Sequence, residues 1–395
     1  MIKSAVGLSR KVQDHRMAGK EAAEEARHKL EEEKASIVFA FASIQYDQEE
    51  VLKGIMEVFP DVTIVGGSAA GEITSWATVF DGVNVMAIAS DKITFTTGLG
   101  HDVLKDSPKA SADAAKDLLS KPGGEKPDLV ISLFDGMTGD GAGLVDGVKS
   151  VLGDNIPLIG GSFGDDYKFE KTYGYYDGKV LSDIAVLIGL KGEFSYGFGI
   201  RHGWEPVGLP LKVTKADGTL LQEVGGKPAL SVYEEHFGKE ASELVKEPLA
   251  RMAYTYPIGI EVEGSDELLI RDPVIANKKG EITMAAAIPE GATIRLMIGD
   301  RDKAIEAAKT AAGVARDQLE GGKPEAIIMF NCMARNKLLG VRCSEENNAV
   351  QKVIGDEVPM MGFYTYGEHG PLLGKKGTPA YFHNETMTLL VLGSK

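Results

Sequence analysis

The hydrophobic and polar positions of this chain repeat one pattern three times. Each repeat begins with a short apolar segment that ends in glycine, at Ile2–Gly7, Ile93–Gly98 and Thr293–Gly299. An alanine-rich segment with apolar residues at every third or fourth position follows, and this spacing predicts an amphipathic helix. A supersecondary pattern that recurs in order indicates structural repeats. We therefore expect three copies of one folding unit.

The strands predicted after these helices carry almost no polar side chains on either face. Their cores read IVFAF, LVISLF and AIIMF, within Ile37–Ser43, Leu129–Asp135 and Ala326–Cys332. Continuous apolar runs are typical of central strands that helices cover on both faces. The pattern predicts an α/β fold with α+β elements in an insertion. Three β-α-β-α-β-hairpin units would form mixed sheets covered by helices, in a two-domain arrangement.

Each copy ends its third strand in a glycine-rich loop, within VTIVGGSAAGE from Val62, IPLIGGSFGDD from Ile156 and VPMMGFYTYGE from Val358. Glycine lets backbone N–H groups approach a ligand closely, and ligands of open α/β sheets lie beyond the carboxyl ends of the strands. The loops are therefore candidates for a pocket, although tight turns alone are the alternative interpretation. The polar candidates in the first two loops are Ser68, Glu72, Ser162 and Asp165.

The third loop and its surroundings hold the densest cluster of polar and aromatic side chains. Arginine can bind a carboxylate through two parallel hydrogen bonds, and tyrosine rings supply apolar walls with a polar tip. The functional hypothesis is a pocket for a small charged molecule. An internal polar network that fixes the last strand is the alternative. The candidates are Arg335, Glu368, Tyr364, Tyr366, His369, Cys332, His383 and Asn384.

Nucleophilic chemistry is considered for Cys332, with His369 or His383 as its base. A buried free cysteine is, however, common as a small hydrophobic residue. The seven histidines are scattered and the two cysteines lack C-x-x-C spacing, which argues against a metal site. We therefore expect no catalytic constellation, no metal and no cofactor.

Composition narrows the classes of function. The chain has 395 residues and a formal net charge of −15, which argues against binding to nucleic acid and to anionic membrane surfaces. No apolar run reaches the ~18–20 residues that span a bilayer, and the N-terminal segment lacks the apolar region of a signal peptide. The two cysteines fit a reducing compartment, so we expect a cytoplasmic protein.

A segment of different character separates the second and third copies. It is rich in turn signals such as Asp217-Gly218 and Gly225-Gly226, and it predicts an α+β insertion. The expected N-terminal domain covers residues 1–228, with units at about 1–92 and 93–200. The expected C-terminal domain covers residues 229–395, with the insertion at about 229–290 and the third unit at about 291–395.

Together these motifs resemble the FIST family, which combines FIST N and FIST C domains. The resemblance extends from Ile2 to Gly393 and rests on VTIVGGSAAGEI, IPLIGGSFGDD, GFGIRHGWEPVG, GKPALSVYEE, FNCMARNKLLG and GFYTYGEHGP…FHNET, in family order. The family implies a prokaryotic sensory module that binds a small ligand, with an amino acid as the favoured class, and no catalytic activity. Arg335 and Glu368 are the candidates for its carboxylate and ammonium. Because the sequence contains no kinase, receptor or cyclase segment, the resemblance implies a freestanding sensor that acts through a signalling partner in trans, or a role outside signalling.

Three alternatives stay open. One branch of the family is described as haem-binding nitric oxide sensors, for which His202, His369 and His383 are the candidate axial ligands. A second alternative is an enzyme with Cys332 as its nucleophile. A third is an interaction scaffold that binds no small molecule. The ligand, the partner and the oligomeric state do not follow from the sequence.

Overall fold

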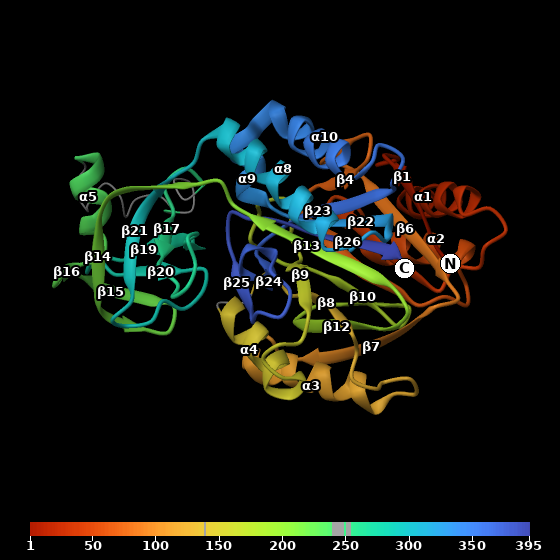
Figure 1. Ribbon diagram of the computed structural model, residues 1–395, viewed down its shortest axis with the longest axis horizontal. Coiled ribbons are helices and arrows are strands. Elements are labelled where there is room, and N and C mark those ends of the chain that lie inside the picture. The colour runs from red at the N-terminus through yellow and green to blue at the C-terminus, as the bar shows by residue number, and fades with distance from the viewer. Residues whose placement is uncertain (138–139, 239–248, 250–253) are drawn as a thin grey trace.

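The computed structural model describes residues 1–137, 140–238, 249 and 254–395, which form two parts (Figure 1). The larger part, called the ring body, contains the described residues of 1–201 and 299–395. The smaller part, called the lobe, contains the described residues of 202–298 and projects from one end of the ring body (Figure 1). No helix in these described segments is long and apolar enough to cross a membrane.

Three six-stranded sheets build the ring body, and the expected mixed α/β architecture is confirmed. The first sheet has the order β1 (Ile2–Ser9), β6 (Val83–Ser90), β2 (Ile37–Ser43), β3 (Ile64–Ala69), β10 (Gly174–Tyr176) and β11 (Lys179–Leu181). The second has the order β25 (Ala380–His383), β24 (Glu368–Pro371), β9 (Leu158–Ser162), β8 (Leu129–Phe134), β12 (Ile184–Gly192) and β7 (Ile93–His101). The third has the order β13 (Ser195–Arg201), β26 (Met387–Ser394), β22 (Lys323–Cys332), β23 (Met360–Thr365), β4 (Glu72–Thr74) and β5 (Thr78–Val79).

Each sheet is completed by strands from a different unit. β10 and β11 of the second unit join the sheet of the first unit, next to β3. β24 and β25 of the third unit join the sheet of the second, next to β9. β4 and β5 of the first unit join the sheet of the third, next to β23. These three exchanges close a ring in which each unit contributes two strands to the sheet of another unit.

Backbone hydrogen bonds between the three glycine-rich loops join the units again near the end of β3, β9 and β23. In each loop, the donor is the backbone N–H three positions after the glycine pair or its equivalent, and the acceptor is a carbonyl of another unit. The loops are therefore equivalent in their contacts as well as in their sequences. The bonds join Ala70 N to Tyr364 O at 3.0 Å, Gly164 N to Ser68 O at 3.2 Å, and Tyr366 N to Ser162 O at 3.2 Å.

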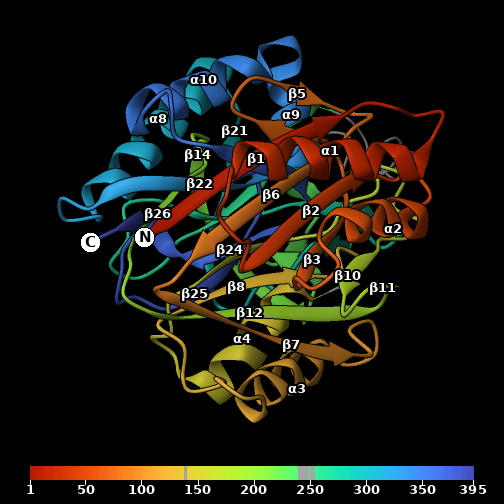
Figure 2. The ribbon, with the colours of Figure 1, turned by 90° about the vertical axis from the view of Figure 1, so that its right-hand side faces the viewer.

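Helices cover the outer faces of the sheets (Figure 2). Five of them begin after an aspartate whose side chain accepts a backbone N–H of the first turn, a cap worth ~1 kcal/mol. These are α1 (His15–Lys29, capped by Asp14), α2 (Gln48–Val58, Asp47), α3 (Ser107–Ser120, Asp106), α4 (Gly141–Leu152, Asp140) and α8 (Arg301–Asp317, Asp300). The third unit adds α9 (Met333–Leu339), the short η1 (Gly340–Arg342), α10 (Cys343–Ile354) and, after β24, the short η2 (Leu372–Gly374).

The inner faces of the three sheets share one aromatic core. Phe41 of the first unit stacks on Phe363 of the third, with ring centres 3.9 Å apart. Phe330 meets the same ring edge-on at 5.9 Å. All three are at most 1% exposed. Burial of each such side chain contributes ~1.5–3 kcal/mol, so the core favours the closed ring.

The structure differs from the prediction at the start of the third unit. Thr293–Ile298 forms β21 inside the lobe, and β13 instead pairs with β26 along seven residues. Glycine explains why β13 fits this place. A Cβ on Gly197 would collide with the carbonyl of Ala315 in α8, just as one on Gly7 would collide with Ala22 in α1. The insertion therefore interrupts the third unit between its first strand and its first helix.

The lobe is an antiparallel sheet with one described helix, α5 (Ser231–Phe237). The predicted turn signals mostly lie between its strands, so the α+β character of the insertion holds. Its strand order is β18 (Leu269–Arg271), β17 (Ile258–Ile260), β21 (Thr293–Ile298), β14 (Glu205–Asp217), β15 (Leu220–Val224), β20 (Ile282–Met284) and β19 (Pro273–Ala276), with β16 (Lys227–Pro228) beside β15.

Candidate functional site

A cavity of about 490 Å³ lies where the lobe meets the ring body. We call it the junction cavity. Its walls come from the carboxyl ends of β22 and β23, the loop after β9, the turn before β26, and the lobe strands β19 and β20. It is lined by Tyr167, Phe169, Asp272, Pro273, Val274, Ile275, Ala285, Cys332, Met333, Ala334, Thr365, Tyr366 and Asn384.

An acid pair sits at this junction. Asp272 comes from the lobe and Glu385 from the turn before β26. The backbone N–H of Asp272 donates to Asn384 Oδ1 at 3.3 Å, which places Asp272 beside this turn, and the two acids raise each other's cost of ionisation or share a proton. Asp272 Oδ1 and both carboxyl oxygens of Glu385 are buried without a described hydrogen-bond donor. Two facing acceptors need a proton or a cation between them. The pair is therefore a ready acceptor for a positive group.

Burial controls the charge of this pair. It raises the pKa of Asp272 to about 7, against the weaker opposing effects of Glu385 and Arg271. Burial, together with the neighbouring acids, also raises the pKa of Glu385 well above its usual value. The pair therefore holds at least one proton near neutral pH, and a cation bound there would replace it.

The backbone at Glu385 is also unusual, because its φ of 60° lies in the left-handed region. For a residue other than glycine or asparagine, this backbone conformation costs ~1–2 kcal/mol. Such strain is concentrated at functional sites. The turn thus holds an acid in a buried, strained and unsatisfied position, which indicates a role beyond packing.

Cys332 lines the cavity, and its thiol is 4% exposed. Burial and the nearby Glu368 and Glu385 raise the pKa of this thiol well above its usual value. The neutral thiol is a weak nucleophile. Glu368 itself accepts hydrogen bonds from the Thr365 hydroxyl and from Thr386 N, so it belongs to an internal network behind the cavity.

The loop after β9 is fixed by Asp165. Its carboxylate accepts the N–H groups of Phe169, Glu170 and Lys171 at 2.7–3.0 Å, and the hydroxyl of Tyr366. Asp165 is 1% exposed and does not line the cavity. It positions the loop that supplies two aromatic walls, instead of facing a ligand.

Arg335 has no donor left for a ligand. Nε binds Glu346 at 2.9 Å, and the two terminal nitrogens bind Glu346 again and the carbonyls of His202, Ala304 and Glu385. The side chain is 0% exposed. The predicted carboxylate clamp is therefore a structural residue here, which ties α9 to α10, α8, the start of the lobe and the strained acid turn.

The remaining predicted residues lie away from the junction cavity. The imidazole of His369 contacts the hydroxyls of Ser132 at 2.9 Å and Ser162 at 3.3 Å. Ser68 accepts Tyr173 N, and Glu72 accepts Gly82 N. Tyr364 packs against Phe80, with ring centres 6.0 Å apart. Of the predicted pocket, the structure brings Cys332, Tyr366 and Asn384 to the cavity wall.

The three histidines considered for haem are engaged internally. His202 accepts Trp204 N at 2.9 Å and contacts Leu268 O at 3.1 Å, and His383 contacts Gly370 O at 3.0 Å. Burial lowers the pKa of His202 and His369 to about 3, and that of His383 to about 4. They do not line the junction cavity, and an axial ligand would first have to give up an internal partner.

Sequence reasoning missed Asp272, Glu385, Tyr167 and Phe169. Glu385 was visible inside the FHNET motif, although its strained turn was not. Asp272 lies 60 residues before Cys332 in the chain, within the insertion. Only the folding of the lobe against the ring body brings the two together.

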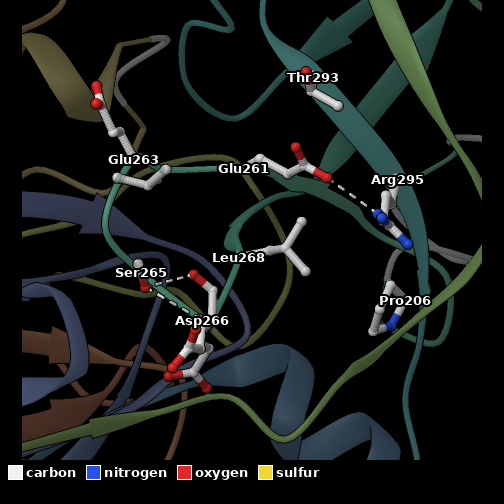
Figure 3. Close-up of a pocket in the computed structure, with 10 residues that line it drawn as sticks. Pro206, Glu261, Glu263, Ser265, Asp266, Leu268, Thr293 and Arg295 are labelled. Carbon is white, nitrogen blue, oxygen red and sulfur yellow. Dashed lines mark hydrogen bonds and ion pairs between the residues drawn. The ribbon is translucent and has the colours of Figure 1, made fainter.

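A second cavity, of about 560 Å³, lies on the lobe (Figure 3). It is rich in carboxylates, which include Glu261, Glu263 and Asp266. Arg295 points into it and pairs with Glu261 at 3.2 Å (Figure 3). None of the described residues that line this cavity has a buried side-chain oxygen without a hydrogen-bond partner, in contrast to the acid pair.

Comparison with known proteins identifies the two halves of the chain. Residues 36–227 match the FIST N domain, and residues 229–371 match the FIST C domain. Together the two matches cover most of the chain and meet between Lys227 and Ala229, at the end of β16.

Two relatives match part of the chain at modest sequence identity. An uncharacterized protein of Mycobacterium tuberculosis is 27% identical over 221 residues, which are 55% of this chain and 57% of that protein. One of Methanocaldococcus jannaschii is 29% identical over 161 residues, 38% of this chain and 31% of that protein. The chain thus spans little more than half the length of the mycobacterial relative and less of the archaeal one.

Solved structures offer only a faint likeness. A cyanuric acid hydrolase described as a product of structural concatenation has a TM-score of 0.38 and 10% identity, with full coverage of both chains. The cyanuric acid hydrolase of A. caulinodans has a TM-score of 0.32 and 8% identity over 100% of this chain and 99% of that one. Scores this low carry no argument about function.

Proposed function

This chain belongs to the FIST family, and we propose that it is a sensory protein that binds a small ligand with a cationic group in the junction cavity. FIST domains are known as small-ligand sensory domains in signal transduction. The observation that carries the choice of site is the acid pair of Asp272 and Glu385, whose buried oxygens lack a described donor. An unsatisfied buried acceptor costs ~1–3 kcal/mol, which a cationic ligand would recover.

An amino acid is the ligand class that the family resemblance implies. We assign its ammonium to the acid pair and no longer to Glu368. The carboxylate of Glu368 already accepts hydrogen bonds from the Thr365 hydroxyl and from Thr386 N. Its carboxylate would need a partner other than Arg335, whose donors are used within the protein. Binding of the ammonium group is therefore better supported than binding of the carboxylate group.

We propose that binding changes the relation between the lobe and the ring body. The acid pair takes one carboxyl from each part, and Asp272 N also donates to Asn384 Oδ1 across the junction at 3.3 Å. A ligand that prefers one arrangement of these groups shifts the population towards it. A separate signalling protein, acting in trans in the cytoplasm, would read this change. The two buried free cysteines are compatible with a reducing location.

The proposal is binding without catalysis. The Cys332 thiol has a raised pKa, and the two histidines considered as its base are held by Ser132, Ser162 and Gly370. A nucleophilic cysteine needs a lowered pKa or an adjacent base.

A thermal-shift titration of the full chain tests the proposal, with the twenty amino acids, simple amines and simple carboxylates as probes. A ligand at a hundredfold excess over its Kd stabilises the native state by ~2.7 kcal/mol, which raises the melting temperature. We expect a rise for compounds with an ammonium group and none for simple carboxylates. We expect Asp272→Asn to lose that rise.

Asp166→Asn is the matched control. Asp166 also has a buried oxygen without a described partner and a raised pKa, but it does not line the cavity. This variant should respond to the same compounds as the unmodified protein. An equal response in Asp272→Asn, or no response to any probe, would remove the junction cavity as the ligand site.

A further inference from the structure

We infer that the junction cavity selects an amine with an apolar body and no carboxylate, an inference that rests on the ligand site proposed above. Three features of the cavity carry it: an acid pair for the ammonium, no described basic side chain in the wall, and an apolar rim. Each is independent of the family resemblance, which favours a zwitterion.

The first feature is the sign of the charged groups. Asp272 is the charged residue among the described residues that line the cavity, and none of these is Lys, Arg or His. The adjacent Arg271 gives its guanidinium to the carbonyls of Ile270, Ala287 and Phe382 at 2.9–3.3 Å. The lining therefore offers a positive ligand an anionic partner and offers a carboxylate no described cationic one.

For this reason, we expect a zwitterion to bind with lower affinity than the same amine without a carboxylate. Its carboxylate would lose water beside Asp272, Glu385 and Glu368 without a described cation to replace it. Removing an unpaired carboxylate from water is more costly than removing a neutral group of the same size, and nearby negative charges add to the cost. The same molecule without its carboxylate avoids both effects.

Lys337 is a basic side chain with a described contact to a residue of the cavity wall. Its Nζ lies 5.0 Å from the centre of the Tyr167 ring, and the side chain is exposed on α9. Exposed lysines stay hydrated and bind a carboxylate weakly. Lys337 is thus a described cation through which a zwitterion could still be accepted, and it can be tested directly.

The second half of the inference concerns the body of the ligand. Phe169, Val274 and Ile275 line the cavity while 47%, 38% and 51% exposed. The Phe169 ring also stacks on Tyr366 at 4.9 Å, which makes a flat aromatic wall. Exposed apolar side chains around a concave site favour an apolar occupant, and a volume of about 490 Å³ exceeds the need of ammonium alone.

Four probes with one phenyl ring separate the possibilities: 2-phenylethylamine, L-phenylalanine, 3-phenylpropionate and 2-phenylethanol. Their Kd values are measured by calorimetry with the full chain at pH 8, where the acid pair is more deprotonated than at neutral pH. We expect the amine to bind at least tenfold more tightly than phenylalanine, and the acid and the alcohol to bind more weakly still. Ethylamine should bind at least tenfold more weakly than 2-phenylethylamine.

The outcomes distinguish this inference from the proposed function. Equal or tighter binding of phenylalanine overturns the inference but leaves the site, provided that Asp272→Asn abolishes binding. Equal binding of ethylamine overturns the apolar half. Binding of no probe, or binding unaffected by Asp272→Asn, overturns both.

Lys337→Gln isolates the remaining route for a carboxylate. The amine should bind this variant with unchanged or higher affinity, because a positive charge near the site is lost. A zwitterion that binds the unmodified protein tightly and loses tenfold or more in Lys337→Gln would show that Lys337 holds its carboxylate, which contradicts the inference.

Discussion

At the scale of the residue, the structure divides the candidates by the partners they already have. Arg335 and Asp165 looked like ligand groups in the sequence, because charged side chains near glycine loops often are. Both are fully engaged inside the protein. Asp272 and Glu385 were missed, yet Oδ1 of Asp272 in the cavity wall and both carboxyl oxygens of Glu385 in the neighbouring turn are buried without a described donor. A side chain's type is visible in a sequence, but its remaining hydrogen-bonding capacity is not.

Replacing Arg335 with Ala should destabilise the protein by ~3–5 kcal/mol, because Glu346 would stay buried without its partner. Urea unfolding measures this loss. Arg342→Ala is the matched control, since that side chain is 32% exposed in its pairs with Glu345 and Asp302, and its loss should destabilise the protein far less. A stable Arg335→Ala protein that no longer binds the probes would restore Arg335 as a ligand residue.

The pH dependence of stability should reveal the acid pair. The folded state raises the pKa of Asp272 above its usual 3.8 to about 7, so the folded protein binds the proton more tightly than the unfolded chain. Stability from this group is therefore present at low pH and falls as the pH rises from about 4 to about 7, on the order of 1.4 kcal/mol for each unit crossed. The affinity for an amine should rise over the upper part of the same range.

The difference between the unmodified protein and Asp272→Asn isolates this effect from the other buried acids. Melting temperatures between pH 4.5 and 7.5 should fall less steeply in the variant, which should also be the more stable protein at pH 7.5. Identical slopes would show that Asp272 titrates normally. Asp272 shares electrostatic interactions that shift pKa values with six other groups. These are Arg271, Glu385, Glu368, Cys332, Tyr167 and Tyr233.

At the scale of the element, the buried strands and alanine-rich helices followed from the sequence because their patterns are local. Ala18, Ala22, Ala26 and Leu30 are all 0% exposed, as their spacing predicts. The choice of the third unit's first strand did not follow, because SYGFGIR and TIRLMI are similar apolar segments. Partnership with β26 and close contact with α8 decide between them, and neither is a local property.

Gly197→Ala tests why β13 takes this place. Its Cβ would collide with the carbonyl of Ala315, so strand and helix must move apart, at ~1–3 kcal/mol. Gly313→Ala on the same helix meets no atom within 4 Å and should stabilise by up to ~1 kcal/mol. Chemical denaturation compares the two. Equal effects would mean that the contact between β13 and α8 is not tight.

At the scale of the whole molecule, the exchange of strands predicts cooperative unfolding. Trp76 lies in the turn between β4 and β5 of the exchanged hairpin, and Trp204 lies at the start of the lobe. Single-tryptophan variants, Trp204→Phe and Trp76→Phe, should show coincident urea midpoints, because the hairpin cannot leave β23 without opening the ring. An earlier transition at Trp76 would show that the hairpin detaches independently.

The same exchange of strands sets an order on synthesis. The first sheet needs no residue beyond Leu181, so it can assemble while the ribosome is still making the lobe. The hairpin that begins at Glu72 must wait for β23, which starts at Met360. Domains generally fold as units during translation, N-terminal part first, and unpaired strand edges invite aggregation. This nascent chain therefore carries an unpaired hairpin until it is almost complete. We expect its folding to benefit from a chaperone that protects this hairpin, or from slow translation of the last codons.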